Sequence, residues 1–303
     1  MRKIFQSIRF LLAPQRFFWV LLAFGLLSGC KSQPAPIEEA PPIVEALSLP
    51  SFALTLKDIV ADDPSYVKAY FLLEAETMLS TDSHANIVSW HVDIDGQDPG
   101  SALYLDYRKG DFYPGDPIQL RLDIDLDALA AKGLAPKDEY NITLIAELDF
   151  FVPSAEAPIR REVRGNVSFP GVRPPVFSIN DIAILQAELI NTRFRVGLKI
   201  DNPNQFPIEL SAFSYKLYGN GRFWADGSER NVLKVNGSSS LSGNIFLIMN
   251  FIDMDRNLLD QIIRLDDVNY RFQGDVDIST GVAYLPKFHD SFNLTGYSKV
   301  FTQ

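Results

Sequence analysis

The sequence offers few side chains suited to acid–base or metal chemistry, and three of them stand together. Apolar and polar side chains alternate along residues 90–95, and the polar ones are His91, Asp93 and Asp95. Alternate residues of a strand project from one face. A histidine between two carboxylates could hold a weakly bound divalent metal or exchange protons. The alternative is a solvated polar face above buried apolar side chains.

The other acidic runs predict local structure. Asp93 to Asp98 lacks the spacing and the final glutamate of a calcium loop. Asp123, Asp125 and Asp127 would cap and flank the start of a predicted helix, where negative charge is favoured. No nucleophile elbow, phosphate loop, dinucleotide fingerprint or zinc pattern occurs. We therefore predict a non-enzymatic protein without metal or cofactor. A metal-assisted hydrolase at the His91 face stays a minor alternative.

The single cysteine, Cys30, lies in a chemically specific context. A basic leader precedes an apolar run of 11 residues, Phe17 to Leu27, which is too short to span a bilayer. Leu27, Ser28, Gly29 and Cys30 resemble the bacterial lipobox, in which the cysteine becomes the acylated N-terminus. The alternative is an uncleaved signal anchor with a buried cysteine. With no second cysteine, a disulfide is excluded.

Charge and the acyl group together predict the compartment. The chain has 28 basic and 38 acidic side chains, and the leader, residues 1–29, carries four of the basic ones. The mature chain would have 24 basic side chains and a net charge of −14, which disfavours nucleic acid and anionic headgroups. Attachment would rest on the lipid, with residues 30–48 as a proline-rich tether. Lys31 favours the outer membrane of the bacterial envelope over inner-membrane retention.

The rest of the chain predicts two β domains. Residues 49–170 and 177–303 repeat a strand rhythm at an offset of 125, and the proline-rich residues 171–176 join them. Phe52 then aligns with Phe177, and residues 69–75 align with 194–200. We expect two tandem antiparallel β-sandwiches, each with one short helix. The alternative is two unrelated β domains that share a strand rhythm.

Several elements are specific enough to be tested. Helices are expected over 125–132 and 253–265. The apolar parity of Ile208 to Leu217 slips near Ser211, which predicts a β-bulge. Asn220-Gly221 predicts a tight hairpin, because both residues tolerate positive φ. Leu241 to Phe251 is apolar on both faces, as in a central buried strand.

A family resemblance rests on the turn Asn202-Pro203-Asn204. Phe206-Pro207-Ile208, Ser214-Tyr215, the Asn220-Gly221 hairpin and Ala225-Asp226-Gly227 follow it. Together they resemble the group 2 late-embryogenesis-abundant family, also called the WHy domain. The resemblance implies a small fibronectin-like or immunoglobulin-like β-sandwich and a link to desiccation stress. It implies no catalytic residues.

These observations lead to two functional expectations. The first is a lipid-anchored, non-enzymatic envelope protein that binds a partner or protects other proteins during water stress. Phe206, Phe223 and Trp224 flank predicted turns and would line a recognition surface, or else cap the core. The second is a carrier or sensor of an apolar ligand, such as lipid, held between sheets and helix.

Overall fold

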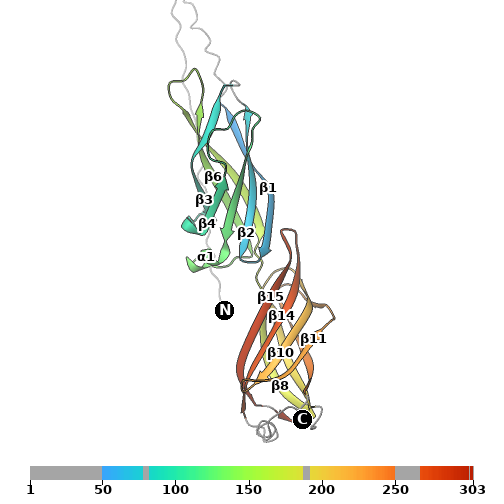
Figure 1. Cartoon of the computed structure of the whole chain (residues 1–303). Coiled ribbons are helices and arrows are strands. Elements are labelled where there is room, and N and C mark those ends of the chain that lie inside the picture. Colours follow the sequence, from blue (N-terminus) through green and yellow to red (C-terminus); the bar gives the residue numbers. More distant parts are fainter. Residues whose placement is uncertain (1–49, 78–81, 187–191, 250–266, 300, 303) are drawn as a thin grey trace, which may run out of the picture. The chain divides into compact units, whose positions relative to one another are not determined.

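The computed structural model describes residues 50–77, 82–186, 192–249, 267–299 and 301–302, which are almost entirely strands. These residues belong to one compact unit, Ser48–Gln303. They form four sheets, and every strand pair is antiparallel except that of β16 (Phe301–Thr302) with β8 (Val176–Gln186). The expectation of a mainly β, antiparallel protein is confirmed (Figure 1).

The first half of the chain forms two sheets. One has the order β1 (Ser51–Asp63), β2 (Tyr66–Thr77), β5 (Ile118–Asp125), β4 (Leu103–Tyr107). The other has the order β3 (His84–Ile94), β6 (Glu139–Phe151), β7 (Ile159–Pro170). This division matches the strand order of immunoglobulin constant domains. Tyr140 near the start of β6 adds a tyrosine corner, because its hydroxyl accepts a bond from the Lys137 amide at 3.3 Å.

The second half repeats this order. Strands β8, β9 (Thr192–Asn202) and β13 (Ser239–Met249) form one sheet with β16. The other sheet runs β11 (Arg222–Glu229), β10 (Ile208–Gly219), β14 (Asp267–Val282), β15 (Leu285–Lys299), with β12 (Leu233–Val235) beside β10. The difference is that β4 pairs with β5 whereas β11 pairs with β10. No observation divides Ser48–Gln303 further, so the division into two domains stays a prediction.

The apolar alternation read from the sequence points into the sheets' inner faces. In β9 the even-numbered residues, Phe194 to Ile200, are all at most 4% exposed. Phe194 packs in parallel against Trp224 of the opposite sheet at 5.3 Å between ring centres. Burying large side chains of this kind stabilises the fold by about 1.5–3 kcal/mol each.

Three glycines make room for aromatic rings on the strand opposite. Gly227 faces Tyr215, Gly274 faces Phe292, and Gly296 faces Tyr270, each as a directly opposed cross-strand pair. A Cβ built at any of them would lie 2.4–2.7 Å from the facing ring. These positions therefore require glycine for close packing, and each ring covers the bare backbone of its neighbour.

The predicted β-bulge, hairpin and first helix are present. The register of β10 on β14 shifts between Ser211 and Ser214, and Ala212 adopts φ 49°, so the bulge lies where the parity slips. Asn220 and Gly221 have φ of 48° and 79° and join β10 to β11 as a two-residue hairpin. Helix α1 (Leu126–Ala131) begins at Asp125, whose carboxylate accepts the Ala128 amide at 2.8 Å.

One expectation about position is wrong. Strand β13 is not central, because among the described strands it pairs only with β9 and lies at the edge of its sheet. Its outward-facing Phe246 and Ile248 are exposed although they are apolar. The second expected helix, over 253–265, lies outside the described residues. In the part of the chain that the structure describes, the helices are too short to cross a bilayer.

Candidate functional site

The turn that carries the family resemblance is densely hydrogen-bonded. Asn202 is 2% exposed. Its amide nitrogen Nδ2 donates to the carbonyls of Phe206 at 2.8 Å, Asn236 at 3.0 Å and Val235 at 3.3 Å. Its oxygen Oδ1 accepts the backbone amide of Asn204 at 3.0 Å. One side chain thereby fixes the loops on both sides of the turn.

Asn204 continues this network toward the connecting segment. It is 1% exposed, and its Oδ1 and Nδ2 pair with the backbone amide and carbonyl of Arg173 at 2.7 and 2.8 Å. Arg173 in turn contacts the carbonyl of Pro203 at 2.7 Å and the carboxylate of Asp138. We name Asn202, Pro203, Asn204 and Arg173 the asparagine hub. The hydrogen bonds of its two asparagines all serve structure, whereas Nε of Arg173 is buried without a hydrogen-bond partner.

The strand face that carries His91, Asp93 and Asp95 points away from the core, as predicted. Val92 and Ile94 are buried, whereas His91 and Asp95 are exposed. The carboxylates already have partners. Asp93 accepts the amide of Gly96 at 2.5 Å, and Asp95 lies 2.6 Å from the Lys137 ammonium.

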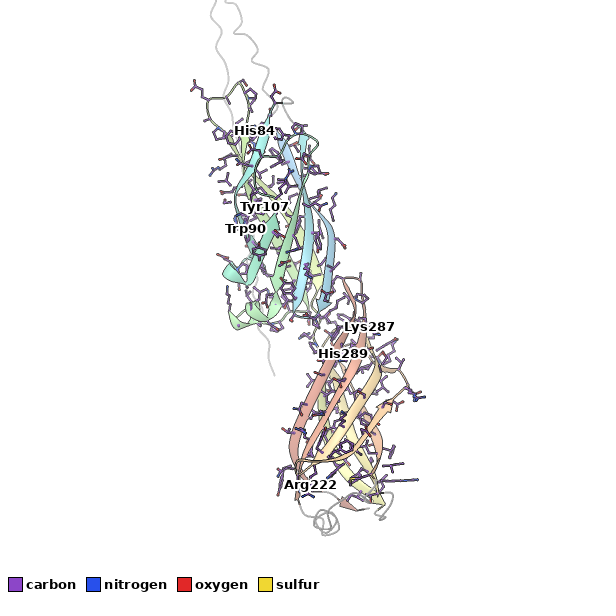
Figure 2. All side chains as sticks on the ribbon, viewed as in Figure 1. His84, Trp90, Tyr107, Arg222, Lys287 and His289 are labelled. Carbon is purple, nitrogen blue, oxygen red and sulfur yellow. The ribbon has the colours of Figure 1, made fainter. Side chains whose placement is uncertain are left out.

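The other histidines lie elsewhere, as Figure 2 shows. His84 stacks on Phe151 at 4.7 Å between ring centres. His289 Nδ1 is 3.1 Å from Asp277 Oδ1. The hydrogen bond from His289, helped by Lys287, lowers the pKa of Asp277 below its ordinary value. Among the described residues, no three His, Cys, Asp or Glu side chains are arranged to hold a metal.

The three candidate recognition aromatics occupy different environments. Trp224 is 3% exposed and belongs to the core, so it cannot line a surface. Phe206 is partly buried against the same core. Phe223 is 52% exposed and touches Tyr218 edge-on at 5.8 Å. Trp224 turns inward because the register of β11 on β10 shifts between Leu217 and Tyr218.

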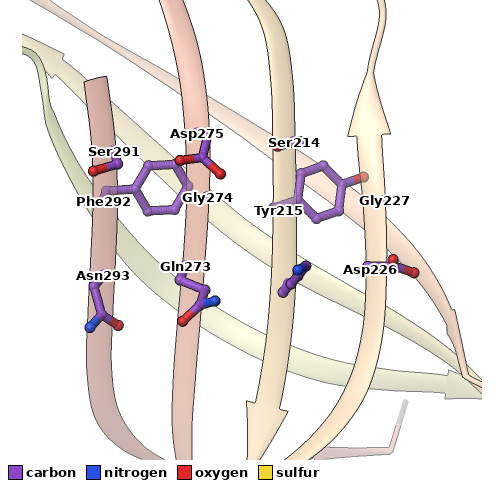
Figure 3. Close-up of a pocket in the computed structure, with 11 residues that line it drawn as sticks. Ser214, Tyr215, Asp226, Gly227, Gln273, Gly274, Asp275, Ser291, Phe292 and Asn293 are labelled. Carbon is purple, nitrogen blue, oxygen red and sulfur yellow. The ribbon is translucent and has the colours of Figure 1, made fainter. Parts of the chain in front are cut away.

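A polar trough crosses the sheet of β11, β10, β14 and β15, with a volume of about 360 Å³. Figure 3 shows Gln273, Asp275, Ser291 and Asn293 on β14 and β15, together with the rings of Tyr215 and Phe292. Lys216 and Asp226 line its other half. Sequence reasoning missed this hollow, because only the cross-strand register brings these residues together. The available signal was the spacing of glycines opposite aromatics.

An apolar slot opens between the two sheets at the β11 and β13 edges. It measures about 170 Å³. Its lining is mostly aliphatic and aromatic, with Glu229 as the ionisable residue. The lining side chains from β9, β10, β12 and β13 include Leu198, Ile200, Phe213, Leu233, Leu241 and Ile245. The slot can accept part of an apolar chain. It is smaller than the 300–1,000 Å³ typical of pockets that enclose a drug-sized ligand.

The leader, Cys30 and the tether lie outside the described residues, so lipidation stays a prediction. The described fold and the asparagine hub define the class of protein, an antiparallel β-sandwich protein with strand orders of the immunoglobulin and fibronectin kind. Residues 197–289 match the model of the late embryogenesis abundant protein family. This match supports a late-embryogenesis-abundant-type domain over these residues, which include Asn202, the bulge, the hairpin and part of the trough.

Comparisons with individual proteins add less. No curated protein matches the chain. A protein from Archaeoglobus fulgidus is 20% identical, with a TM-score of 0.25, over 41% of this chain and 97% of its own. A Porphyromonas gingivalis W83 protein of unknown function is 12% identical, with a TM-score of 0.25, over 80% of this chain and 98% of its own. At these TM-scores neither likeness bears on function.

Proposed function

We propose that this protein is a lipid-anchored, non-enzymatic protein of the bacterial cell envelope, acting as an interaction or desiccation-protection module. Its two halves would be tandem domains of the WHy type. Cys30 would carry the acyl chains, and the proline-rich tether would hold the sandwiches away from the membrane. The recurring strand order and the family match over 197–289 support this reading.

The observation that carries the proposal is the use of the family-like residues. Asn202, Asn204, Asn220 and Gly221 hold turns and loops together, and their polar groups are engaged by backbone partners. What the domain offers to other molecules is therefore its folded surface. That surface belongs to a mature chain with a net charge of −14, which keeps it hydrated and separates it from other acidic proteins as water is lost.

Protection is tested by drying. A drying-sensitive enzyme is dehydrated and rehydrated with the unit Ser48–Gln303 or with a folded control protein of the same size and net charge. We expect more enzyme activity to survive with Ser48–Gln303 than with the control at equal mass. Equal recovery would remove the protective role. Anchoring is tested separately by labelling with a palmitate analogue, where Cys30→Ser in the full chain should abolish both the label and the membrane fraction.

The apolar slot favours a second candidate, a carrier or sensor of an apolar ligand. A single acyl chain could enter between the sheets with its polar end near Glu229. Mass spectrometry of the purified unit would detect a copurified lipid. Leu241→Trp should fill the slot and reduce binding of a fluorescent fatty acid, whereas Ser240→Trp, which faces outward on the same strand, should not. Absence of lipid, or equal binding by both variants, would exclude the carrier.

A further inference from the structure

The polar trough has two walls, each made by a row of outward-pointing polar side chains that oppose one another across the strands. One row, on β15, β14 and β10, consists of Ser291, Asp275 and Ser214. The other row crosses all four strands and consists of Asn293, Gln273, Lys216 and Asp226. Figure 3 shows both rows on the face of the sheet. The trough therefore runs across the strands, in the middle of the sheet.

The floor of the trough is the row between the two walls, and no side chain fills it from below. Phe292 and Tyr215 of this row point into the core, where Phe292 stacks on Phe177 of the opposite sheet at 4.5 Å between ring centres. The other two members, Gly274 and Gly227, have no side chain. The floor is thus bare backbone, which lets a ligand lie between the walls.

Elsewhere in the fold, outward polar side chains that oppose one another bond to each other. The Ser89 hydroxyl donates to the Glu147 carboxylate at 2.6 Å, and the Thr143 hydroxyl donates to the Asn166 amide oxygen at 2.9 Å. Such pairs hold their neighbouring strands together and leave few polar groups for a ligand.

The walls of the trough differ in this respect. Gln273 directly opposes Asn293, and Lys216 directly opposes Asp226. Within the ranges that the structure describes, the side chains of these four residues form no hydrogen bond or ion pair with the protein. Their donors and acceptors therefore face the hollow and are available to a bound molecule.

The charges of the trough favour a neutral ligand. Its ionisable residues are Lys216, Asp226 and Asp275, so an anion would meet two carboxylates and a cation would meet an ammonium group. The charges one row further out have partners of their own. Arg271 lies 4.2 Å from the Tyr218 ring centre, and Asp277 lies 3.1 Å from His289.

The hydrogen-bonding groups narrow the choice of ligand further. Amides, hydroxyls and carboxylates together donate and accept, as the hydroxyl groups of a sugar do. A peptide strand gains little here, because the backbone of the central strands β10 and β14 is already paired on both sides. The volume of about 360 Å³ lies within the 300–1,000 Å³ typical of small-molecule sites.

We propose that the trough binds a neutral oligosaccharide, whose hydroxyl groups bond to the amides of Gln273 and Asn293 and to the charged groups of Lys216, Asp226 and Asp275. This proposal names a ligand class for the interaction module proposed above, and to that extent it rests on that function. It requires neither an acyl chain on Cys30 nor protection during drying, so the experiments on those two points can fail independently of this one.

Titration calorimetry of the unit Ser48–Gln303 tests the proposal. The neutral probes are cellotetraose, maltotetraose and tetra-N-acetylchitotetraose, and the anionic probe is tetragalacturonate. We expect a neutral probe to bind, and Gln273→Ala/Asn293→Ala to weaken its binding at least about tenfold, because hydrogen bonds from two side chains are lost. The control Gln119→Ala/Asn166→Ala removes exposed side chains of the same two types from sheets of the first half and should bind as wild type does.

Amide NMR shifts of the wild-type unit locate the bound probe without any substitution. On saturation the resonances of Lys216 and Asn293 should move, whereas that of Leu241 in the apolar slot should not. Equal urea midpoints of the two double variants would show that lost binding is not lost folding. The proposal is overturned if no neutral probe binds, if tetragalacturonate binds more tightly than all of them, or if the shifts lie outside the trough. It is also overturned if Gln273→Ala/Asn293→Ala binds like the control.

Discussion

The asparagine hub allows a quantitative test of the fold. Asn202→Ala would leave the buried amide of Asn204 and the part-buried carbonyls of Phe206 and Asn236 without this partner. Each buried group that loses its partner costs about 1–3 kcal/mol. Allowing for entry of water, we expect a total loss of about 3 kcal/mol. With a urea slope near 2 kcal/mol per M, the midpoint should fall by about 1.5 M.

The assay can isolate the relevant sandwich. Ser48–Gln303 contains two tryptophans, Trp90 in the first half and Trp224 in the second. In a Trp90→Phe background, Trp224 fluorescence reports on the sandwich that holds the hub. The matched control is Asn244→Ala, an exposed asparagine on β13, for which we expect a change within about 0.5 kcal/mol. If Asn202→Ala shifts the midpoint no further than this control, the hub does not hold the fold.

Three other measurements test the packing, the hairpin and the surface charge. Gly274→Ala should lower the free energy of unfolding by about 1–3 kcal/mol in a urea titration, because its Cβ would lie 2.5 Å from the Phe292 ring. The control Gly243→Ala has open space around the new Cβ and should not lower it. Equal effects of the two variants would contradict the packing argument. Gly221→Ala should cost about 1–2 kcal/mol through its φ of 79° alone, and a neutral result would contradict the strained turn. Because the folded pKa of Asp277 is lowered, its interaction stabilises the protein above the unfolded pKa of about 3.9 and is lost as pH falls through the folded value. His289→Ala should therefore raise the Asp277 pKa in carboxyl NMR titrations, and an unchanged pKa would contradict the pairing.

Strand positions were predictable where one face of a strand is buried. The alternation in residues 194–200 follows directly from a polar and an apolar face, and it appears in β9 as predicted. Turn residues were equally informative, because Asn220 and Gly221 tolerate the positive φ that a two-residue hairpin needs. The bulge near Ser211 was readable since a single extra residue reverses the parity of everything after it.

The sequence did not predict which strands lie beside a given strand in its sheet. Leu241 to Phe251 is apolar on both faces. This pattern fits a central strand, and it fits equally well an edge strand on which Phe246 and Ile248 are exposed. Among the strands that the structure describes, β13 pairs only with β9, and a sequence pattern does not contain this pairing. The two readings of Trp224, surface or core, could not be separated for a related reason, because a register shift in its hairpin turns it into the core. The trough was missed since it depends on the register of four strands at once.

These differences bear on where function lies. The residues that resemble the family, such as Asn202 and Gly221, are positions at which backbone geometry or buried hydrogen bonds demand one residue type. A match over residues 197–289 therefore reports chiefly that the fold is retained. The features that could distinguish this chain lie elsewhere, in the trough and the slot. Leu241→Trp should therefore change what the protein binds more than it changes folding, whereas Asn202→Ala should do the reverse.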